Sequence, residues 1–140
     1  MSKTNAFENS ILALIFNATA IADMAENDTS SPATTLTVSL HTADPGETGD
    51  MTTNEATYTS YARVTVNRNS GGWTVTGNSV SPTANIDFPT ATGGSETITH
   101  VGIGSGVSDN LMYKGALTPT IAVSNGVTPR VTTASTITED

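Results

Sequence analysis

The stretch Leu40–Arg63, LHTADPGETGDMTTNEATYTSYAR, contains the change of pattern that decides the fold. The segment Thr35–His41, which leads into it, alternates apolar and polar residues as a half-buried strand does. An acidic turn and a threonine-rich connection follow, and a second alternating segment occupies Ala62–Val66. Because this connection is too long for a plain turn, the sequence predicts a long loop or arm over residues 42–60 of a β domain.

Short β segments continue to the end of the chain. Ala62–Val66 and Trp73–Val75, with Gly71 and Gly72 near the bend, predict a β-hairpin. Further strands are expected at Ala84–Phe88, Ile98–Ile103, Leu111–Leu117, Thr120–Val123 and Arg130–Ile137. Such spacing, with turn residues between the strands, is typical of a sandwich. The predicted fold is mainly β: a jelly-roll-like antiparallel β-sandwich over residues 34–140, with one N-terminal α-helix.

Residues 1–25 have the period of that helix, and the polar residues 26–33 form a linker. Asn5 is the expected N-cap, with Glu8 three residues later as in a capping box. The apolar run Ile11–Phe16 is too short to span a bilayer, and polar residues precede and follow it, which favours a folded helix over a signal peptide. The apolar stripe of the helix consists of Phe7, Ile11, Leu14, Ile15, Ala18 and Ile21. This stripe packs either on its own domain or on a partner subunit.

The composition of the 140 residues narrows the chemistry further. The absence of cysteine removes disulfides, zinc–thiolate sites and a thiol nucleophile. Threonine makes up about a fifth of the chain, which favours half-buried β surfaces. A net charge of −8 with five Lys and Arg disfavours binding to nucleic-acid phosphates.

No pattern in the sequence predicts a catalytic, cofactor or metal site, so we expect a protein that is not an enzyme. His41 and His100 have no other ligand at metal-binding spacing. The segment Gly102–Gly106, GIGSG, has the wrong glycine spacing for a dinucleotide loop. The acidic turn at Asp44–Asp50, DPGETGD, matches no calcium loop, which favours a solvated turn or a charged contact.

The order of several sequence pieces resembles that of a family of small tailed-bacteriophage virion proteins, described as tail-fibre or head-decoration (cement) proteins. The pieces are FENSILALIFNATAIA (7–22), LTVSLHTADPG (36–46), YARVTV (61–66), IDFPTATGGSETITHVGIG (86–104) and NLMYKGALTPTIAVSNGVTPRVTTASTIT (110–138). The resemblance implies a β-sandwich subunit that assembles on the virion and is made in the cytoplasm of the bacterial host. It leaves open whether the subunit lies on the capsid shell or in the tail.

Our preferred hypothesis is a capsid decoration (cement) protein that binds the outside of the major capsid protein shell and stabilises it. The alternatives are a tail-fibre or baseplate component and, from another class, a carbohydrate-binding β-sandwich. Because a second copy would cover open edge strands, we expect a homodimer, with a trimer as the second choice, and no nucleic-acid or membrane partner.

The candidate contact residues lie in the acidic connection, among the few cations and on the helix stripe. They are Asp44, Glu47, Asp50, Glu55, Tyr58, Arg63, Arg68, Arg130, Phe7 and Ile11. Arg63 and Arg130 have an alternative role, because each could pair with an acid of its own sheet.

Overall fold

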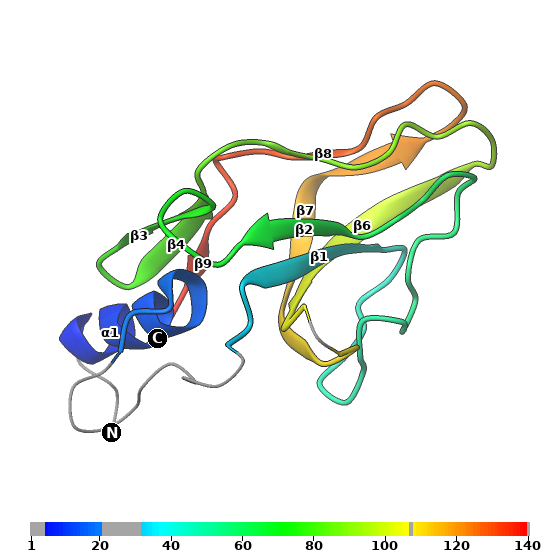
Figure 1. Cartoon of the computed structure of the whole chain (residues 1–140). Coiled ribbons are helices and arrows are strands. Elements are labelled where there is room, and N and C mark those ends of the chain that lie inside the picture. The colour runs from blue at the N-terminus through cyan, green and yellow to red at the C-terminus, as the bar shows by residue number, and fades with distance from the viewer. Residues whose placement is uncertain (1–4, 21–31, 107, 140) are drawn as a thin grey trace. The chain divides into compact units, whose positions relative to one another are not determined.

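The computed structural model describes residues 5–20, 32–106 and 108–139 (Figure 1). Its elements are α1 (Asn5–Asn17), β1 (Thr35–His41), β2 (Val64–Asn67), β3 (Trp73–Thr76), β4 (Ser79–Pro82), β5 (Ile86–Asp87), β6 (Glu96–Gly104), β7 (Leu111–Val123), β8 (Arg130–Val131) and β9 (Ile137–Thr138). The fold is mainly β, with antiparallel sheets and one N-terminal helix, consistent with a β-sandwich. The predicted fold class is therefore confirmed.

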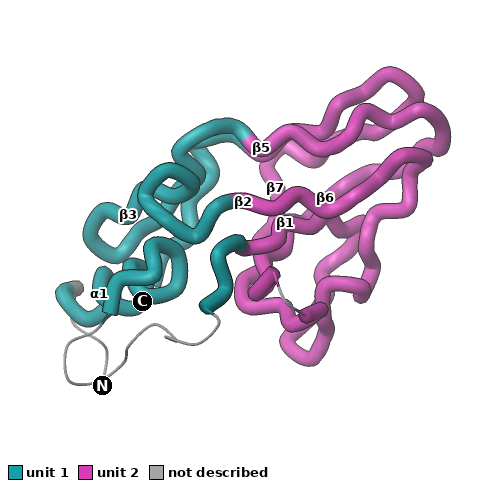
Figure 2. Tube along the Cα trace, viewed as in Figure 1, with its two compact units in different colours: residues 1–35, 67–85, 132–140 teal, residues 36–66, 86–131 magenta. Residues whose placement is uncertain are grey.

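The chain divides into two compact units (Figure 2). Unit 1 comprises Met1–Thr35, Asn67–Asn85 and Thr132–Asp140, and unit 2 comprises Leu36–Val66 and Ile86–Val131. No helix in the described part of the chain is long and apolar enough to cross a membrane.

Unit 1 consists of α1 packed on the β3–β4 hairpin, to which β9 adds a third strand. Leu12 and Phe16 of the helix are fully buried, and the Phe16 ring meets Trp73 of β3 edge to face, with centroids 4.9 Å apart. An edge-to-face aromatic pair adds to the free energy gained by burying the two rings. This aromatic contact lies at the centre of the unit 1 core.

The buried face of α1 differs from the predicted stripe. Glu8, Leu12 and Phe16, each four residues apart, point inward, whereas Phe7 is 38% exposed and Ile11 is half-buried. Residues four apart share one helix face, so the buried face is the predicted stripe rotated by one residue. Ile21, which also belonged to the predicted stripe, lies outside the described residues.

The helix also ends earlier than its predicted limit near residue 25. Ala18 adopts a left-handed backbone conformation with φ of 54°, and the Thr19 amide donates to the carbonyl of Ala13. A left-handed residue immediately after the last turn is a common helix stop. The described helix therefore terminates at Asn17.

The predicted hairpin of Ala62–Val66 with Trp73–Val75 is wrong. Strand β3 pairs instead with β4, a strand that the sequence patterns did not reveal, and Thr76 lies opposite Ser79. The two-residue loop between them starts with Gly77 at φ of 61°, and glycine at this position suits a tight hairpin turn. Strand β2 is an edge strand beside β1.

Unit 2 is built on the sheet of order β2-β1-β6-β7. Strands β1 and β6 pair antiparallel with Val38 opposite Ile103, and β6 pairs antiparallel with β7. A small second sheet pairs Ile86 of β5 with Val131 of β8. Leu36, Val38 and Leu40 are buried, as the alternation at 35–41 predicts, and Ile98 of β6 is buried as well.

Two predicted strand boundaries require correction. Leu111–Leu117 and Thr120–Val123 form the single strand β7, in which the residues around Pro119 bulge away from β6. Bulges and edges are the places where a strand tolerates proline. Conversely, the predicted strand Arg130–Ile137 is divided into β8, which pairs with β5, and β9, which pairs with β4.

Candidate functional site

The connection 42–60 lies over one face of the β1–β6 sheet. Ser39 and His41 point to the face that the sequence marks as polar, yet both side chains are fully buried. Met51 of the connection is also fully buried, and a Cβ built on Gly104 of β6 would lie 2.0 Å from its sulfur. Glycine at 104 therefore leaves the space that the Met51 side chain occupies.

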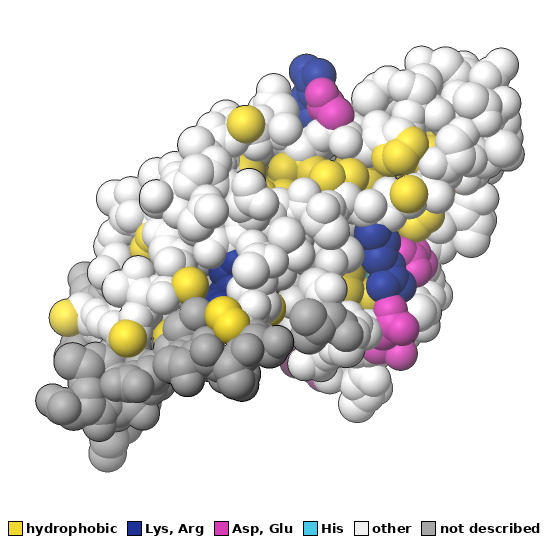
Figure 3. Space-filling model, viewed as in Figure 1, with side chains coloured by type: hydrophobic (Ala, Val, Ile, Leu, Met, Phe, Trp, Pro, Cys, Tyr) yellow, Lys and Arg dark blue, Asp and Glu magenta, His cyan; other side chains and the backbone are white. Residues whose placement is uncertain are grey.

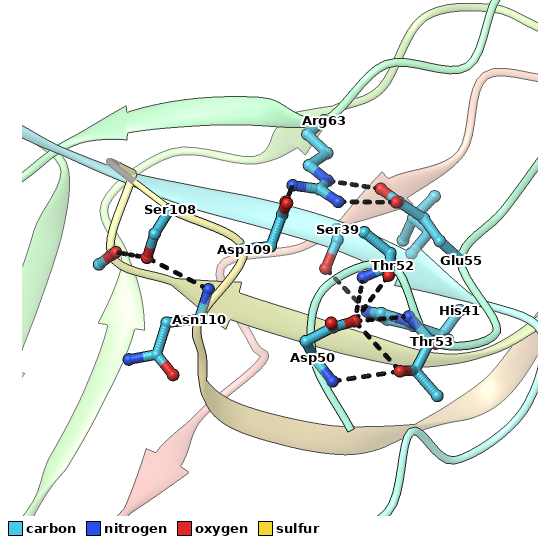
Figure 4. Close-up of polar contacts among 12 residues, drawn as sticks. Ser39, His41, Asp50, Thr52, Thr53, Glu55, Arg63, Ser108, Asp109 and Asn110 are labelled. Carbon is cyan, nitrogen blue, oxygen red and sulfur yellow. Dashed lines mark hydrogen bonds and ion pairs between the residues drawn. The ribbon is translucent and has the colours of Figure 1, made fainter. Parts of the chain in front are cut away.

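His41 is the polar centre of this covered face (Figure 4). Its Nδ1 lies 2.8 Å from the carbonyl oxygen of Thr53, and its Nε2 lies 2.8 Å from Ser39 Oγ. Because a carbonyl only accepts, Nδ1 donates to Thr53 and Nε2 accepts from the Ser39 hydroxyl. Burial lowers the pKa of His41 below its ordinary value. The bond from His41 to the Thr53 carbonyl joins the connection to β1, and the bond to Ser39 holds the buried imidazole in place.

Backbone hydrogen bonds hold the same connection along β1. The amide of Thr42 donates to the carbonyl of Asn54, and the amide of Ala56 donates to that of Leu40. Asp50 closes the intervening turn by accepting from the amides and hydroxyls of Thr52 and Thr53. These bonds, first among them the one from the Thr52 hydroxyl, lower the pKa of Asp50.

Arg63 joins the connection to the loop before β7 (Figure 4). Its Nε and Nη2 donate to the two carboxylate oxygens of Glu55 at 2.6 and 2.8 Å, and its Nη1 donates to Asp109. The Tyr61 hydroxyl donates to Glu55 at 2.9 Å. The hydrogen bond to Glu55 raises the pKa of Arg63, and burial raises the pKa of Tyr61. This network joins segments that are far apart in the sequence.

Asp44 and Glu47, the acidic residues of the predicted turn, meet Lys114 of β7. The Lys114 Nζ lies 3.1 Å from Asp44 and 3.0 Å from Glu47, whose side chain is 91% exposed. Hydrogen bonds to Glu47 and, to a smaller extent, to Asp44 raise the pKa of Lys114. The hydrogen bond from the Gly46 amide lowers the pKa of Asp44. Such an exposed ion pair contributes little to stability.

The other candidate cations also have contacts within their own unit. Arg130 of β8 forms an ion pair with Asp87 of β5, which lowers the pKa of Asp87. Arg68 donates to the carbonyls of Leu14 and Ile15 in the last turn of α1, where unpaired carbonyls favour a cation. Arg63 and Arg130 thus have the ion-pair role that the sequence left as an alternative.

Tyr58 and the helix candidates complete the set. Tyr58 is buried, and its hydroxyl donates to the carbonyl of Pro89 at 2.9 Å. Phe7 and Ile11 lie in unit 1, where Phe7 is partly exposed and Ile11 is half-buried. Whether any of the ten candidates contacts a partner remains a prediction.

Sequence reasoning missed three residues that contact the connection 42–60: Glu96, Asp109 and Lys114. The Glu96 carboxylate accepts from the amides of Thr57 and Tyr58 at 3.0 Å each. Glu96 and Lys114 are isolated charges among uncharged strand residues, and this is the only signal in the sequence for these contacts. Their partners could not be predicted, because Thr57 lies 39 residues from Glu96 and Asp44 lies 70 residues from Lys114. Within the described residues, no group of three or more His, Asp or Glu side chains could hold a metal ion.

The comparison with protein families extends over nearly the whole chain. Residues 2–138 match the family model described as Podophage GP4 fiber I protein gp80. No curated protein matches the sequence. Together with the antiparallel β fold, the family match identifies the chain as a structural protein of the tailed-bacteriophage virion.

More specifically, the chain belongs to the podophage GP4 fiber I protein gp80 family. This membership confirms the resemblance to phage virion proteins. It also favours the tail-fibre alternative over capsid decoration, our preferred hypothesis from the sequence.

Proposed function

We propose that this chain is a fibre subunit of a tailed-phage virion, located in the tail rather than on the capsid exterior. The observation that carries the proposal is the match of residues 2–138 to a fibre protein family. The extent of the match supports a role for the whole chain, since it includes residues of both units.

The role that we propose is structural and non-enzymatic. The buried Ser39–His41 pair supports this view, because a nucleophile and base need access to a substrate and neither side chain is exposed. The ion pairs of Arg63, Lys114 and Arg130 support it as well, since they join distant segments of unit 2.

We further propose that the subunit associates with copies of itself. Strand β7 supports self-association, because it is a 13-residue edge strand of the unit 2 sheet. An edge strand presents backbone groups that a second chain can pair with. A dimer and a trimer are both compatible with this edge, and light scattering of the purified chain distinguishes them.

Virions that lack this chain provide the test. If the chain is a tail-fibre subunit, the particles retain the heat resistance of their shells but adsorb poorly to host cells. Expression of the wild-type chain in trans restores adsorption. Shells that rupture at lower temperature while adsorption stays normal would refute the fibre role and support capsid decoration, with the major capsid protein as partner. Gold-labelled antibody against the chain locates it independently on the tail or the shell.

A further inference from the structure

One end of unit 2 is formed by three segments without a charged side chain: residues 57–61, 88–95 and 124–129. We call this surface the hydroxyl end. The Thr59 amide donates to the carbonyl of Gly93, and the Gly126 amide donates to that of Ala91, so the three segments lie side by side. In Figure 3 this end, at the upper right, displays neither basic nor acidic side chains.

The exposed side chains of the hydroxyl end are alcohols and an amide. They include Ser60, Thr90, Thr92, Ser95, Asn125 and Thr128. In a chain of net charge −8, an uncharged surface of this composition differs from the ion-paired face around Arg63 and Lys114.

Hydrogen bonds between neighbouring hydroxyls hold several of these groups in place. Ser60 and Thr92 are bonded to each other at 2.6 Å, and Thr90 and Thr128 at 2.7 Å. A hydroxyl has one hydrogen and two acceptor lone pairs. The Thr92 hydroxyl also donates to the Thr59 carbonyl, so the Ser60–Thr92 pair offers a ligand its lone pairs. The Thr90–Thr128 pair shares one hydrogen and keeps a second hydrogen and several lone pairs for a ligand.

The backbone of the hydroxyl end is held in conformations that side chains disfavour. Ser60 has a φ of 82°, in a region that suits glycine, and Gly94 and Gly126 have φ values of 83° and 90°. Non-glycine residues in such conformations cluster at functional sites. The strain at Ser60 is a second indication, independent of composition, that this surface has a role.

Buried aromatic rings support the surface from below. The Tyr58 and Tyr61 rings meet edge to face with centroids 5.3 Å apart, and Tyr61 stacks on Phe88 at 6.4 Å. Tyr58 also donates its hydroxyl to the Pro89 carbonyl. A rigid base lowers the entropy lost when a ligand binds.

We propose that the hydroxyl end binds a neutral polysaccharide; this inference rests on the proposed fibre function and names its partner class. An anionic glycan would need a cation, but every Lys and Arg that the structure describes is engaged within its own unit. A neutral polyol can exchange hydrogen bonds with hydroxyls and amides without desolvating a charge.

The same composition sets the strength of binding. The aromatic residues of the hydroxyl end, Tyr58, Tyr61 and Phe88, are buried or half-buried, so they offer a sugar little ring surface to stack on. Binding then depends on hydrogen bonds that replace bonds to water, which makes each contact weak. Several copies on one particle raise the overall avidity without any new contact.

A panel of immobilised oligosaccharides tests the proposal. The full-length chain, biotinylated and displayed on streptavidin, is applied to neutral hexose and N-acetylhexosamine oligomers and to sulfated and uronic acid oligomers. We expect binding to a subset of the neutral oligomers and none to the charged ones. No neutral binding, or equal binding to charged oligomers, would overturn the proposal.

Two paired variants locate the binding surface. T90V/T128V removes a hydroxyl pair from the hydroxyl end and should weaken binding at least tenfold. T74V/T83V removes the comparable exposed pair of unit 1, whose hydroxyls are 3.2 Å apart, and should leave binding unchanged. Equal binding by the two variants would overturn the assignment of this surface. If T90V/T128V, but not T74V/T83V, changes the oligomeric mass of the protein, the assignment is also wrong. The hydroxyl end would then be a contact between two copies of the chain.

Ser60→Gly separates folding from binding. Glycine adopts the φ of residue 60 without strain, so the melting temperature should stay the same or rise, while loss of the hydroxyl weakens glycan binding. A variant that binds as well as the parent would contradict the proposed role of Ser60. If labelling places the chain on the tail but no glycan binds, this inference fails while the fibre function stands. If labelling places the chain on the shell and the chain still binds glycan, the fibre function is refuted while the glycan-binding inference stands.

Discussion

Unit 1 buries its helix against a β-hairpin through apolar side chains, whereas unit 2 holds a long connection to its sheet through many polar contacts. In unit 1, Leu12, Phe16 and Trp73 are buried together, and Arg68 donates to helix carbonyls. In unit 2, His41, Arg63 and Glu96 each join segments that are distant in the sequence. The same chain thus uses two different means of stabilisation.

This difference predicts different responses to solution conditions. Burial of apolar surface depends little on pH and moderate salt, while ion pairs and a buried histidine respond to both. Unit 1 does contain buried polar atoms without a hydrogen-bond partner among the described residues, Glu8 Oε2 and Trp73 Nε1. The free-energy cost of burying these polar atoms must be offset by apolar contacts such as that between Phe16 and Trp73. The first prediction therefore tests that contact.

The largest effect is expected for Phe16→Ala in unit 1. Phe16 is fully buried against Trp73, so its truncation leaves a cavity and should lower the free energy of unfolding by about 3–5 kcal/mol. Phe7→Ala is the matched control on the same helix and should cost no more than about 1 kcal/mol, because Phe7 is partly exposed. Urea unfolding followed by Trp73 fluorescence measures both. Equal losses would show that the buried face of α1 is not the one described.

A smaller effect is expected where the connection covers the sheet of unit 2. In Gly104→Ala the new methyl group would collide with the Met51 sulfur and approach the Asn110 carbonyl, at a cost of about 1–3 kcal/mol. Gly115→Ala on the neighbouring strand β7 is the control, because a Cβ there meets no atom within 4 Å. If Gly104→Ala unfolds at the same urea concentration as the control, the connection does not rest on β6. Limited proteolysis should also cut Gly104→Ala faster within residues 42–60 than it cuts the parent.

The two ion-paired cations of unit 2 should differ in their effect. Arg63→Met removes two hydrogen bonds to the part-buried Glu55 and one to Asp109, which should cost about 1–2 kcal/mol. Lys114→Met removes ion pairs to exposed carboxylates and should destabilise the chain much less than Arg63→Met does. Unfolding at low and high salt checks the comparison: the difference between the two variants should persist at high salt. Convergence at high salt would mean that Arg63 acts as a surface charge only.

The sequence predicted the strands whose alternation marks a single buried face. Leu36, Val38 and Leu40 are such a case, because period-two alternation places them together whatever their partners are. The helix was predicted as well, but its buried face was misjudged by one residue. Glu8 was assigned to a capping box and left out of the apolar stripe, whereas its side chain is buried on the same helix face as Leu12.

Pairings between distant segments could not be predicted. The hairpin partner of β3 depends on the turn at Gly77, and the preceding Gly71 and Gly72 offered an equally good turn signal. Ser39 and His41 alternate as exposed residues do, and only the fold brings Met51 and Thr53 over them. The ten candidate contact residues include four acids and three arginines, and their ion pairs with Asp87, Asp109 and Lys114 were not evident from spacing.

The smallest effect concerns pH and His41. Burial lowers the folded-state pKa of His41 below its ordinary value of 6.5, while the groups around it include Glu55, Arg63 and His100. Below pH 6.5 the unfolded chain therefore binds a proton that the folded chain does not, and the free energy of unfolding falls as the pH is lowered. Above that pH the side chain is neutral in both states and contributes no pH dependence.

His41→Gln isolates this contribution in unit 2. The variant loses packing and is less stable than the parent at pH 7–8, but it lacks the titration. The stability difference between the two proteins should therefore narrow as the pH falls from about 6.5 to about 5. Asp44, Asp50 and Asp87, whose pKa values are lowered in the folded state, lose their contribution only at lower pH, and they do so in both proteins. Urea unfolding at pH 5, 6, 7 and 8 measures the difference. A gap that stays constant from pH 8 to pH 5 would show that His41 is not buried beneath the connection, because an exposed histidine would titrate alike in the folded and unfolded chains.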